Sequence, residues 1–245
     1  MDHRFRAAQF AVVHEAYARA LGAEPAAFES GELAIRRRLD SAPFPYVAVA
    51  LVGARGSVLS VSPDYLELAM AERPTQYFEV ARPAFLKRFL RDDSPAGIGG
   101  PELLWALGSV PALPALPPGL QFEERDAAWM NAEQESFRFP NGVGRPGVNA
   151  RDSRNRFALV ISGAAGEPVA VGGVSDSFGL LEIGVDVLPG HQGSGLGAAV
   201  VAAAARAILD RGGTPLYGCA VDNIRSQRTA YSVGFLPMLT EAWVS

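Results

Sequence analysis

The residues in this sequence best suited to chemistry are three glycines at alternate positions, Gly193, Gly195 and Gly197. They follow a β-rich segment that ends in a proline, and they lead directly into an alanine-rich stretch that favours a helix. Glycine permits positive φ and leaves the backbone N–H groups sterically open. A helix that begins at the same place adds unpaired amides and a partial positive charge. The segment is therefore expected to form a cradle for a phosphate or a diphosphate.

Several interpretations of this glycine turn compete. A nucleotide-binding P-loop needs Gly-Lys-Ser/Thr at the end of the turn, and this turn contains no Lys. A dinucleotide fold needs G-x-G-x-x-G near the start of a βαβ unit, whereas the spacing here is G-x-G-x-G after three antiparallel-looking strands. A purely structural glycine turn is the remaining alternative. The turn alone does not separate these possibilities.

A second pattern follows the glycine turn after one helix and one strand. Asn223 opens the run Asn-Ile-Arg-Ser, and Gly234-Phe235 comes eleven residues later. By itself this run is an asparagine helix cap with a glycine at the helix end. Together the two patterns resemble the acyl-CoA site of the GNAT superfamily of N-acetyltransferases, which has Gln/Arg-x-x-Gly-x-Gly/Ala, then Asn-x-x-Ser/Ala, then Gly-Phe. The segment 192–197 matches at every fixed position, and the resemblance covers about 119–245.

The resemblance implies how an acyl-CoA would be held. The amides of the glycine turn would bind the diphosphate, and the strand before the turn would pair its main chain with the pantetheine arm. A backbone N–H near Val187 would polarise the thioester carbonyl. The residues that the resemblance assigns to the cofactor are Val185, Val187, Gln192, Gly193, Ser194, Gly195, Leu196, Gly197, Asn223 and Ser226.

The resemblance also implies direct attack of a neutral amine on the thioester, which needs a base and an acid. Glu182 lies ten residues before Gln192, where family members often carry a base. Strand alternation puts Glu182, Gly184 and Asp186 on one face, and a structural ion pair with a loop arginine is the alternative role for Glu182. The proposed acid is Tyr231, which stands one position after the usual tyrosine site, so core packing is its alternative role.

The acceptor pocket is expected to involve the helix 126–138 and the loop 139–156, because this region controls access to the second substrate in the resembled family. The loop is rich in arginine, and its guanidinium groups could attract a carboxylate or phosphate on the acceptor. A solvated mobile loop is the alternative. The arginines in question are Arg145, Arg151, Arg154 and Arg156.

The composition excludes several classes of function. The net charge of −4 argues against nucleic acid as a general partner. A single cysteine, Cys219, excludes an intrachain disulfide framework and a cysteine-based zinc site, so no metal is expected. The sequence has no apolar run long enough for a membrane span, and its charged N-terminus does not resemble a signal peptide, which predicts a cytoplasmic protein with no membrane partner. The oligomeric state stays open, with a homodimer as one expected assembly.

A proline-rich stretch, 109–118, predicts an extended linker between two domains, 1–108 and 119–245. The first domain reads as a smaller α+β domain that either shapes the substrate site or is a degenerate GNAT-like half. The second reads as an α/β (α+β) domain with a mixed, mostly antiparallel central sheet flanked by helices, a GNAT-like acyl-CoA fold. Expected helices are 3–21, 63–71, 83–90, 126–138, 196–211 and 223–233. Expected extended segments are 46–52, 57–61, 120–123, 157–161, 168–174, 180–187, 215–221 and 235–244.

The sequence thus predicts an acyl-CoA-dependent N-acyltransferase that moves acetyl from acetyl-CoA to a primary amine. The alternative is a non-catalytic CoA-binding regulatory module, which the displaced tyrosine and the uncertain base keep open. Both hypotheses predict CoA binding, and only the first predicts turnover.

Overall fold

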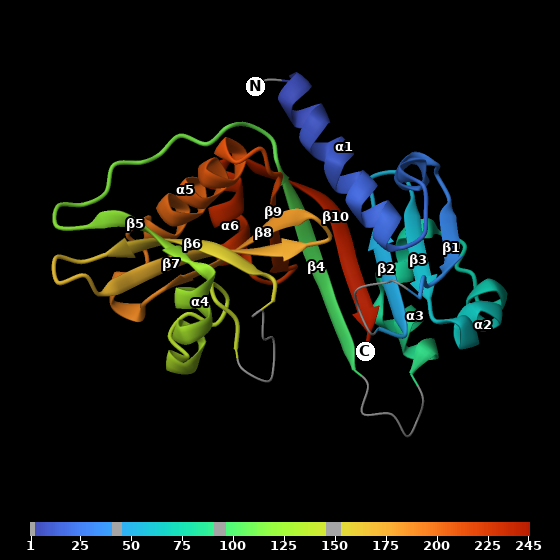
Figure 1. Cartoon of the computed structure of the whole chain (residues 1–245). Helices are drawn as coiled ribbons and strands as arrows, with labels where there is room; N and C mark the ends of the chain where they lie inside the picture. The colour runs from blue at the N-terminus through green and yellow to red at the C-terminus, as the bar shows by residue number, and fades with distance from the viewer. Residues whose placement is uncertain (1–2, 41–45, 91–96, 146–152) are drawn as a thin grey trace. The chain divides into compact units, whose positions relative to one another are not determined.

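A computed structural model describes residues 3–40, 46–90, 97–145 and 153–245 (Figure 1). The chain forms two compact units whose residues are not contiguous in sequence. Unit 1 comprises Met1–Arg6, Ala106–Gly218 and Ile224–Leu236, and unit 2 comprises Ala7–Trp105, Cys219–Asn223 and Pro237–Ser245. The strands β4 (Ile98–Leu107) and β10 (Phe235–Val244) each contribute residues to both units.

Unit 2 contains a sheet whose strands follow the order β1-β3-β2-β10-β4. The hairpin of β2 and β3 is antiparallel, as the sequence predicts, and β1 adds to β3 in parallel. An apolar core lies between this sheet and short helices, with Leu59, Leu86 and Phe89 among its buried members. The other elements of this part of the chain are α1 (His3–Ala20), η1 (Pro25–Glu29), β1 (Leu33–Arg37), β2 (Ala48–Val52), β3 (Ser57–Val61), η2 (Pro63–Tyr65), α2 (Leu66–Ala71), η3 (Tyr77–Ala81), α3 (Pro83–Leu86) and η4 (Lys87–Phe89).

Two strands of unit 2 were not expected from the sequence. The first is β1, which includes Arg36 and Arg37. The segment that begins with Ile98 forms the ten-residue strand β4, although its glycines and proline are poor strand formers. Its close approach to β10 explains one of these glycines, because a Cβ at Gly99 would lie 2.1 Å from the ring of Trp243.

Unit 1 contains a sheet in the order β9-β8-β7-β6-β5. The pairs β5–β6, β6–β7 and β7–β8 are antiparallel, and β8–β9 is parallel. The sheet is therefore mixed and mostly antiparallel. The elements of this part are β5 (Gln121–Asp126), α4 (Ala127–Glu133), η5 (Gln134–Ser136), β6 (Asn155–Ser162), β7 (Pro168–Ser177), β8 (Leu180–Val187), η6 (Pro189–His191), α5 (Leu196–Asp210), β9 (Pro215–Ala220) and α6 (Ile224–Val233).

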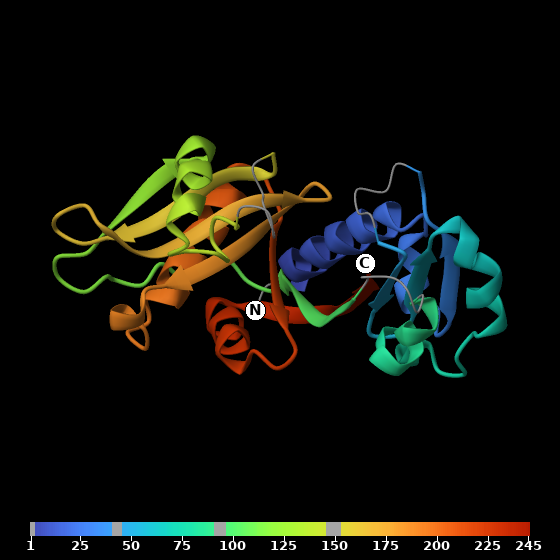
Figure 2. The same cartoon turned by 90° about the horizontal axis from the view of Figure 1, so that it is seen from below.

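The helices α4 and α5 cover opposite faces of the unit 1 sheet, as Figures 1 and 2 show. Successive residues of β7 demonstrate this arrangement. A Cβ at Gly172 would contact Val200 of α5, whereas a Cβ at Gly173 would contact Met130 of α4. Since neighbouring residues of a strand point to opposite faces, each helix has its own face of the sheet.

Candidate functional site

The strands β8 and β9 separate part of the way along their length. Their parallel pairing covers three positions and ends where Ile183 lies opposite Tyr217. The rest of β8 continues to Val187 in regular register with β7 on its other side. Leu188 donates its amide to Val169 O of β7 at 2.9 Å. Alternate residues of a strand direct their main-chain groups to opposite neighbours, so those of Val185 and Val187 point away from β7, to the side where β9 no longer pairs. Beyond Ile183, β9 therefore no longer pairs with β8 at Val185 and Val187, the two valines that the sequence assigns to the pantetheine arm, although Val187 O accepts a side-chain hydrogen bond from Gln192.

The glycine turn lies at the end of that free edge. Gly193 and Gly195 adopt positive φ of 80° and 83°, and a Cβ at either position would meet nothing within 4 Å. Gly195 is the N-cap of α5, so Leu196 and Gly197 present the first helical amides, which have no acceptor within a helix. Within the described part of the chain, no backbone carbonyl accepts from the amides of residues 193 to 195. These amides lie at the N-terminus of α5, where the sequence predicts a cradle for a diphosphate.

The polar side chains of the turn connect it to its surroundings. Ser194 Oγ donates to His191 O at 2.5 Å, so its proton is already used within the turn. Gln192 Nε2 donates to Val187 O at 3.1 Å, and its Oε1 accepts from Arg225 Nη1 at 2.8 Å. Arg225 therefore holds a guanidinium beside the cradle. Arg225 has no predicted role, and its place within the Asn-x-x-Ser pattern is the one feature of the sequence that points to it.

Two predicted residues lie in the helix α6, and a third immediately precedes it. Ser226 Oγ lies 2.8 Å from Tyr217 Oη, at the level where β8 and β9 part. Asn223 immediately precedes the helix, and its amide donates to Ala220 O at 3.0 Å. Tyr231 is 70% exposed, whereas its neighbour Ala230 is fully buried. The structure therefore brings Ser226 to the opening of the two strands and does not bring the Tyr231 side chain into the core.

The two carboxylates of β8 have different environments. Glu182 is half-buried opposite Ser175 of β7. Asp186 Oδ2 accepts from the amides of Asn141 and Gly142 at 2.7 and 2.8 Å, and its Oδ1 accepts from Asn141 Nδ2 at 2.7 Å. Burial raises the pKa of the Asp186 carboxyl above its usual value, although these hydrogen bonds and the charge of Arg145 act in the opposite direction. The carboxylate that the sequence left without a role is the more elaborately bonded of the two.

The first part of the predicted acceptor loop packs against α4 and β7. Phe139 and Val143 are buried in a cluster with Met130 and Val171. Asn155 Nδ2 donates to Val143 O at 3.2 Å. The buried side chains of Phe139 and Val143 therefore anchor this part of the loop in the core of unit 1.

The arginines of that loop have separate surroundings. Arg145 lies close enough to Asp186 to influence its pKa. Arg156 pairs with Asp176 at 3.3 Å, and the main chain of Arg154 accepts from the amide of Asp176. Arg151 lies outside the described residues.

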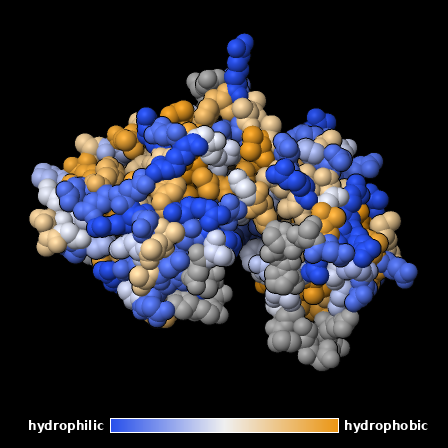
Figure 3. Space-filling model, viewed as in Figure 1, coloured by the Kyte–Doolittle hydropathy of each residue, from blue (hydrophilic) through white to orange (hydrophobic). Residues whose placement is uncertain are grey.

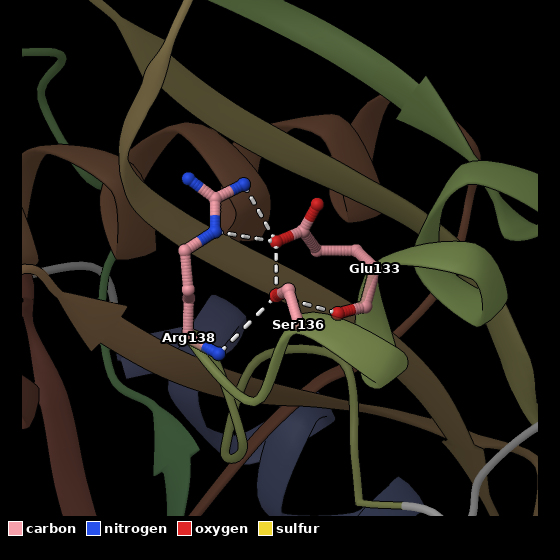
Figure 4. A network of polar contacts seen from close by, with 3 residues as sticks. All are labelled: Glu133, Ser136 and Arg138. Carbon is pink, nitrogen blue, oxygen red and sulfur yellow. Dashed lines mark hydrogen bonds and ion pairs between the residues drawn. The ribbon is translucent and has the colours of Figure 1, made fainter.

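A polar network fixes the turn that leads into this loop (Figure 4). Arg138 donates to Glu133 Oε1 through Nε at 2.9 Å, and its Nη2 lies 2.7 Å from the same oxygen. Ser136 Oγ donates to Glu133 O at 2.8 Å and accepts from the Arg138 amide at 3.2 Å. Phe137 between them has a φ of 56°, which is uncommon for a bulky residue. The network therefore holds the end of α4 and η5 in a conformation that the backbone alone would disfavour.

Two open pockets lie elsewhere and differ from the glycine turn. In unit 1, a pocket of about 530 Å³ is bordered by Glu124 and Arg211, whose ion pair is bidentate at 2.7 and 2.8 Å. In unit 2, a pocket of about 790 Å³ is bordered by His14, whose pKa is lowered by burial and whose ring stacks on Phe28. The pocket in unit 1 is thus lined by an arginine and a glutamate that already pair with each other. The amides of the glycine turn, in contrast, have no backbone acceptor among the described residues.

The described ranges contain neither a metal-binding cluster nor a membrane-spanning helix. These residues contain no group of three or more His, Cys, Asp or Glu side chains placed to hold a metal ion. No helix among them has the length and apolar character needed to cross a bilayer. Hydrophilic residues are spread over the face of the molecule shown in Figure 3. Cys219 is buried.

Comparison with known proteins gives a family model and several solved structures. The family model described as FR47-like protein matches residues 170–244. A tandem GNAT protein from the clavulanic acid biosynthesis pathway is 15% identical over 100% of this chain and 95% of its own, with a TM-score of 0.53. A Drosophila protein is 20% identical over 82% of this chain and 74% of its own, with a TM-score of 0.50. No curated protein matches the sequence. The predicted resemblance to the GNAT superfamily and the predicted fold class are confirmed.

Proposed function

Because this chain has the GNAT fold, we propose that it is an acyl-CoA-dependent N-acyltransferase that transfers an acetyl group from acetyl-CoA to a primary amine. The observation that carries the proposal is the coincidence of two features at one place. The strand edge of Val185 and Val187 no longer pairs with β9, and it runs directly into open amides at the N-terminus of α5. An elongated ligand with an anionic end and an amide-containing arm suits both features.

The residues of the turn fit the diphosphate of CoA. The amides of 193 to 197 would donate to its oxygens, and the positive end of α5 would favour its charge. Positive φ and empty space at Gly193 and Gly195 leave room for the oxygens to approach the main chain. Arg225 would add a cation at the same place, in exchange for its present bond to Gln192. Asn223 and Ser226 would contact the arm of the cofactor from the start of α6.

The reaction would use groups along β8. The Val187 N–H, which points away from β7, would stabilise the oxyanion that forms as the amine nitrogen bonds to the thioester carbon. Glu182 would take the proton of the attacking amine through water, and the carbon–sulfur bond would then break. The departing thiolate would be protonated by Tyr231 or by solvent, and the exposure of Tyr231 favours solvent.

The acceptor would approach from the face of the sheet opposite α5. Val187 packs its side chain toward α5, because its Cγ2 lies within 3.5 Å of a Cβ placed on Gly197. Strand alternation then directs Glu182, Gly184 and Asp186 to the α4 face. Gly184 lies between Glu182 and Asp186 and has no side chain to fill the space between them. The two acids would attract an ammonium group to this place before it loses its proton.

Turnover with a panel of amines tests the proposal. Purified protein is incubated with acetyl-CoA and small amines, amino acids or peptide N-termini, and free thiol is followed over time. The proposal predicts thiol release that depends on both the enzyme and the amine. Tight CoA binding without release for any amine would overturn it and would favour the non-catalytic CoA-binding module, for which the exposed Tyr231 is the structural argument.

A further inference from the structure

Asp186 is bonded in a way that suggests a task other than proton transfer. Both of its oxygens accept hydrogen bonds, and all three donors belong to two consecutive residues, Asn141 and Gly142, about 45 positions away in sequence. Two of the donors are backbone amides, so the carboxylate fixes the path of the main chain itself. No cation forms a close ion pair with Asp186 among the described residues. A buried carboxylate is costly, and donors of this kind offset that cost.

The segment that Asp186 holds is shaped to lie on the sheet at this point. The carbonyl of Gly142 rests on Gly173 of β7, where a Cβ would come within 1.7 Å of the carbonyl oxygen. A Cβ at Gly142 would in turn lie 3.0 Å from Val171 Cγ1. A glycine at 173 is needed for the two backbones to approach so closely, and the lack of a side chain at Gly142 avoids a tight contact with the Val171 side chain. Val171 is the residue opposite Asp186 in the β7–β8 register, so packing and hydrogen bonding act at one level of the sheet.

Other contacts fix the same segment on both sides of Asn141. Before it, the Glu133–Ser136–Arg138 network holds the turn (Figure 4). After it, the Val143 carbonyl accepts from buried Asn155. The residues 139–144 are therefore a preformed wall on the α4 face, and we call them the acceptor wall.

We propose that Asp186 is a positioning residue for the amine acceptor, which clamps the acceptor wall against β8 beside the thioester. This inference rests on the proposed function, since it assigns the wall to the second substrate. The wall meets β8 at the residue between Val185 and Val187, whose amides face the cofactor side. A shift of the wall would therefore change where the amine stands relative to the thioester carbon without altering the glycine turn. Because both oxygens of Asp186 are engaged, Glu182 keeps the role of base.

The test uses Asp186→Asn and Asn141→Ala in the full chain, with Asp210→Asn as the control. Asp210 is an exposed carboxylate at the C-terminal end of α5, at the opposite end of that helix from the glycine turn. Steady-state kinetics with each substrate varied, and hydrogen exchange of residues 139–144, are measured for all three. We expect D186N to raise the KM for the amine about tenfold or more. The kcat and the KM for acetyl-CoA should stay within about threefold, and exchange in the wall should accelerate. N141A should show a smaller change of the same kind, and D210N none.

Other outcomes would overturn the role of Asp186. If D186N loses kcat with an unchanged amine KM, and its pH–rate profile loses its acid limb, then Asp186 is itself the proton acceptor. If D186N and N141A leave both the kinetics and the exchange unchanged, the wall does not depend on the clamp. An inactive wild type overturns the proposed function and the acceptor role together. An active wild type with unaltered variants overturns only the clamp, so the two failures are distinguishable.

Discussion

Two glycine-containing loops of unit 1 use the same residue in opposite ways. At the glycine turn, Gly193 and Gly195 face open space, and their backbone amides have no described backbone acceptor. Where the acceptor wall meets β7, the Gly142 backbone fills the place of a side chain at Gly173, and the Val171 side chain crowds the place of one at Gly142. The glycine turn therefore has space for a ligand beside its main chain, whereas the acceptor wall is held in place by packing. Glycine content alone does not distinguish a binding loop from a packed one, whereas the space around each Cβ position does.

The largest expected effect is at the open loop. Gly195→Asp places a strained, negatively charged residue at a φ of +83° where a diphosphate is proposed to bind. We expect it to weaken CoA binding about a hundredfold or more, because like charges would meet in the cradle. Calorimetric titration with CoA measures the loss.

The matched control is Gly166→Asp in the turn between β6 and β7. Gly166 has a φ of +80° and equally open surroundings, so the strain is the same but no ligand is proposed there. CoA binding should survive in G166D. Equal losses in G195D and G166D would show that strain, and not the cradle, explains the effect.

At the packed loop, the expected effect is on stability. Gly173→Ala puts a methyl group 1.7 Å from the Gly142 carbonyl oxygen, so the wall must move. We expect the free energy of unfolding to fall by about 2 kcal/mol or more. Urea denaturation measures it, with Gly97→Ala as the control because nothing lies within 4 Å of a Cβ there. A stable G173A with an unchanged wall would contradict the close approach of the two backbones.

The sequence predicts the features of this molecule that depend on contacts between neighbouring residues, and it does not predict those that depend on contacts between residues far apart in the chain. The glycine turn, the β2–β3 hairpin and the ends of α5 and α6 depend on neighbouring residues, so local patterns predict them. The clamp of Asp186 joins residues 45 positions apart, and the bond of Gln192 to Arg225 joins residues 33 apart. Nothing in the local pattern at Asp186 indicates Asn141 as its partner. The strand β4 was missed for a similar reason, since its pairing within the sheet overrides the weak strand propensity of its glycines.

A smaller effect should appear at the cation beside the open loop. Arg225→Gln removes the guanidinium that lies next to the cradle, and we expect CoA binding to weaken about tenfold. The loss should shrink as salt is raised, because salt screens an exposed charge. Arg228→Gln, also exposed and three residues later on α6, is the control and should bind CoA like the wild type. Equal binding by R225Q and the wild type at low salt would remove Arg225 from the cradle.

The smallest expected effect is a change of stability with pH that comes from the ionisation of the Asp186 carboxyl. The pKa of Asp186 is raised in the folded state, so its ionised form is less favourable there than in the unfolded chain. The stability of the wild type relative to D186N is therefore greatest below the ordinary aspartate pKa. It should fall as the pH rises through the raised value, by roughly 1.4 kcal/mol for each pKa unit of the shift. Thermal or urea unfolding of both proteins between acid and neutral pH measures this difference. A difference that grows with pH would mean that the hydrogen bonds of the clamp outweigh its burial.

The most direct measurement is a titration of the wild-type chain with coenzyme A in a calorimeter, followed by a melting curve with and without the ligand. If the amides of 193 to 197 and the free edge of β8 bind this cofactor, one molecule binds per chain and the melting temperature rises with ligand concentration. Absence of both binding heat and thermal shift at millimolar coenzyme A would contradict the proposal that the glycine turn and β8 bind this cofactor.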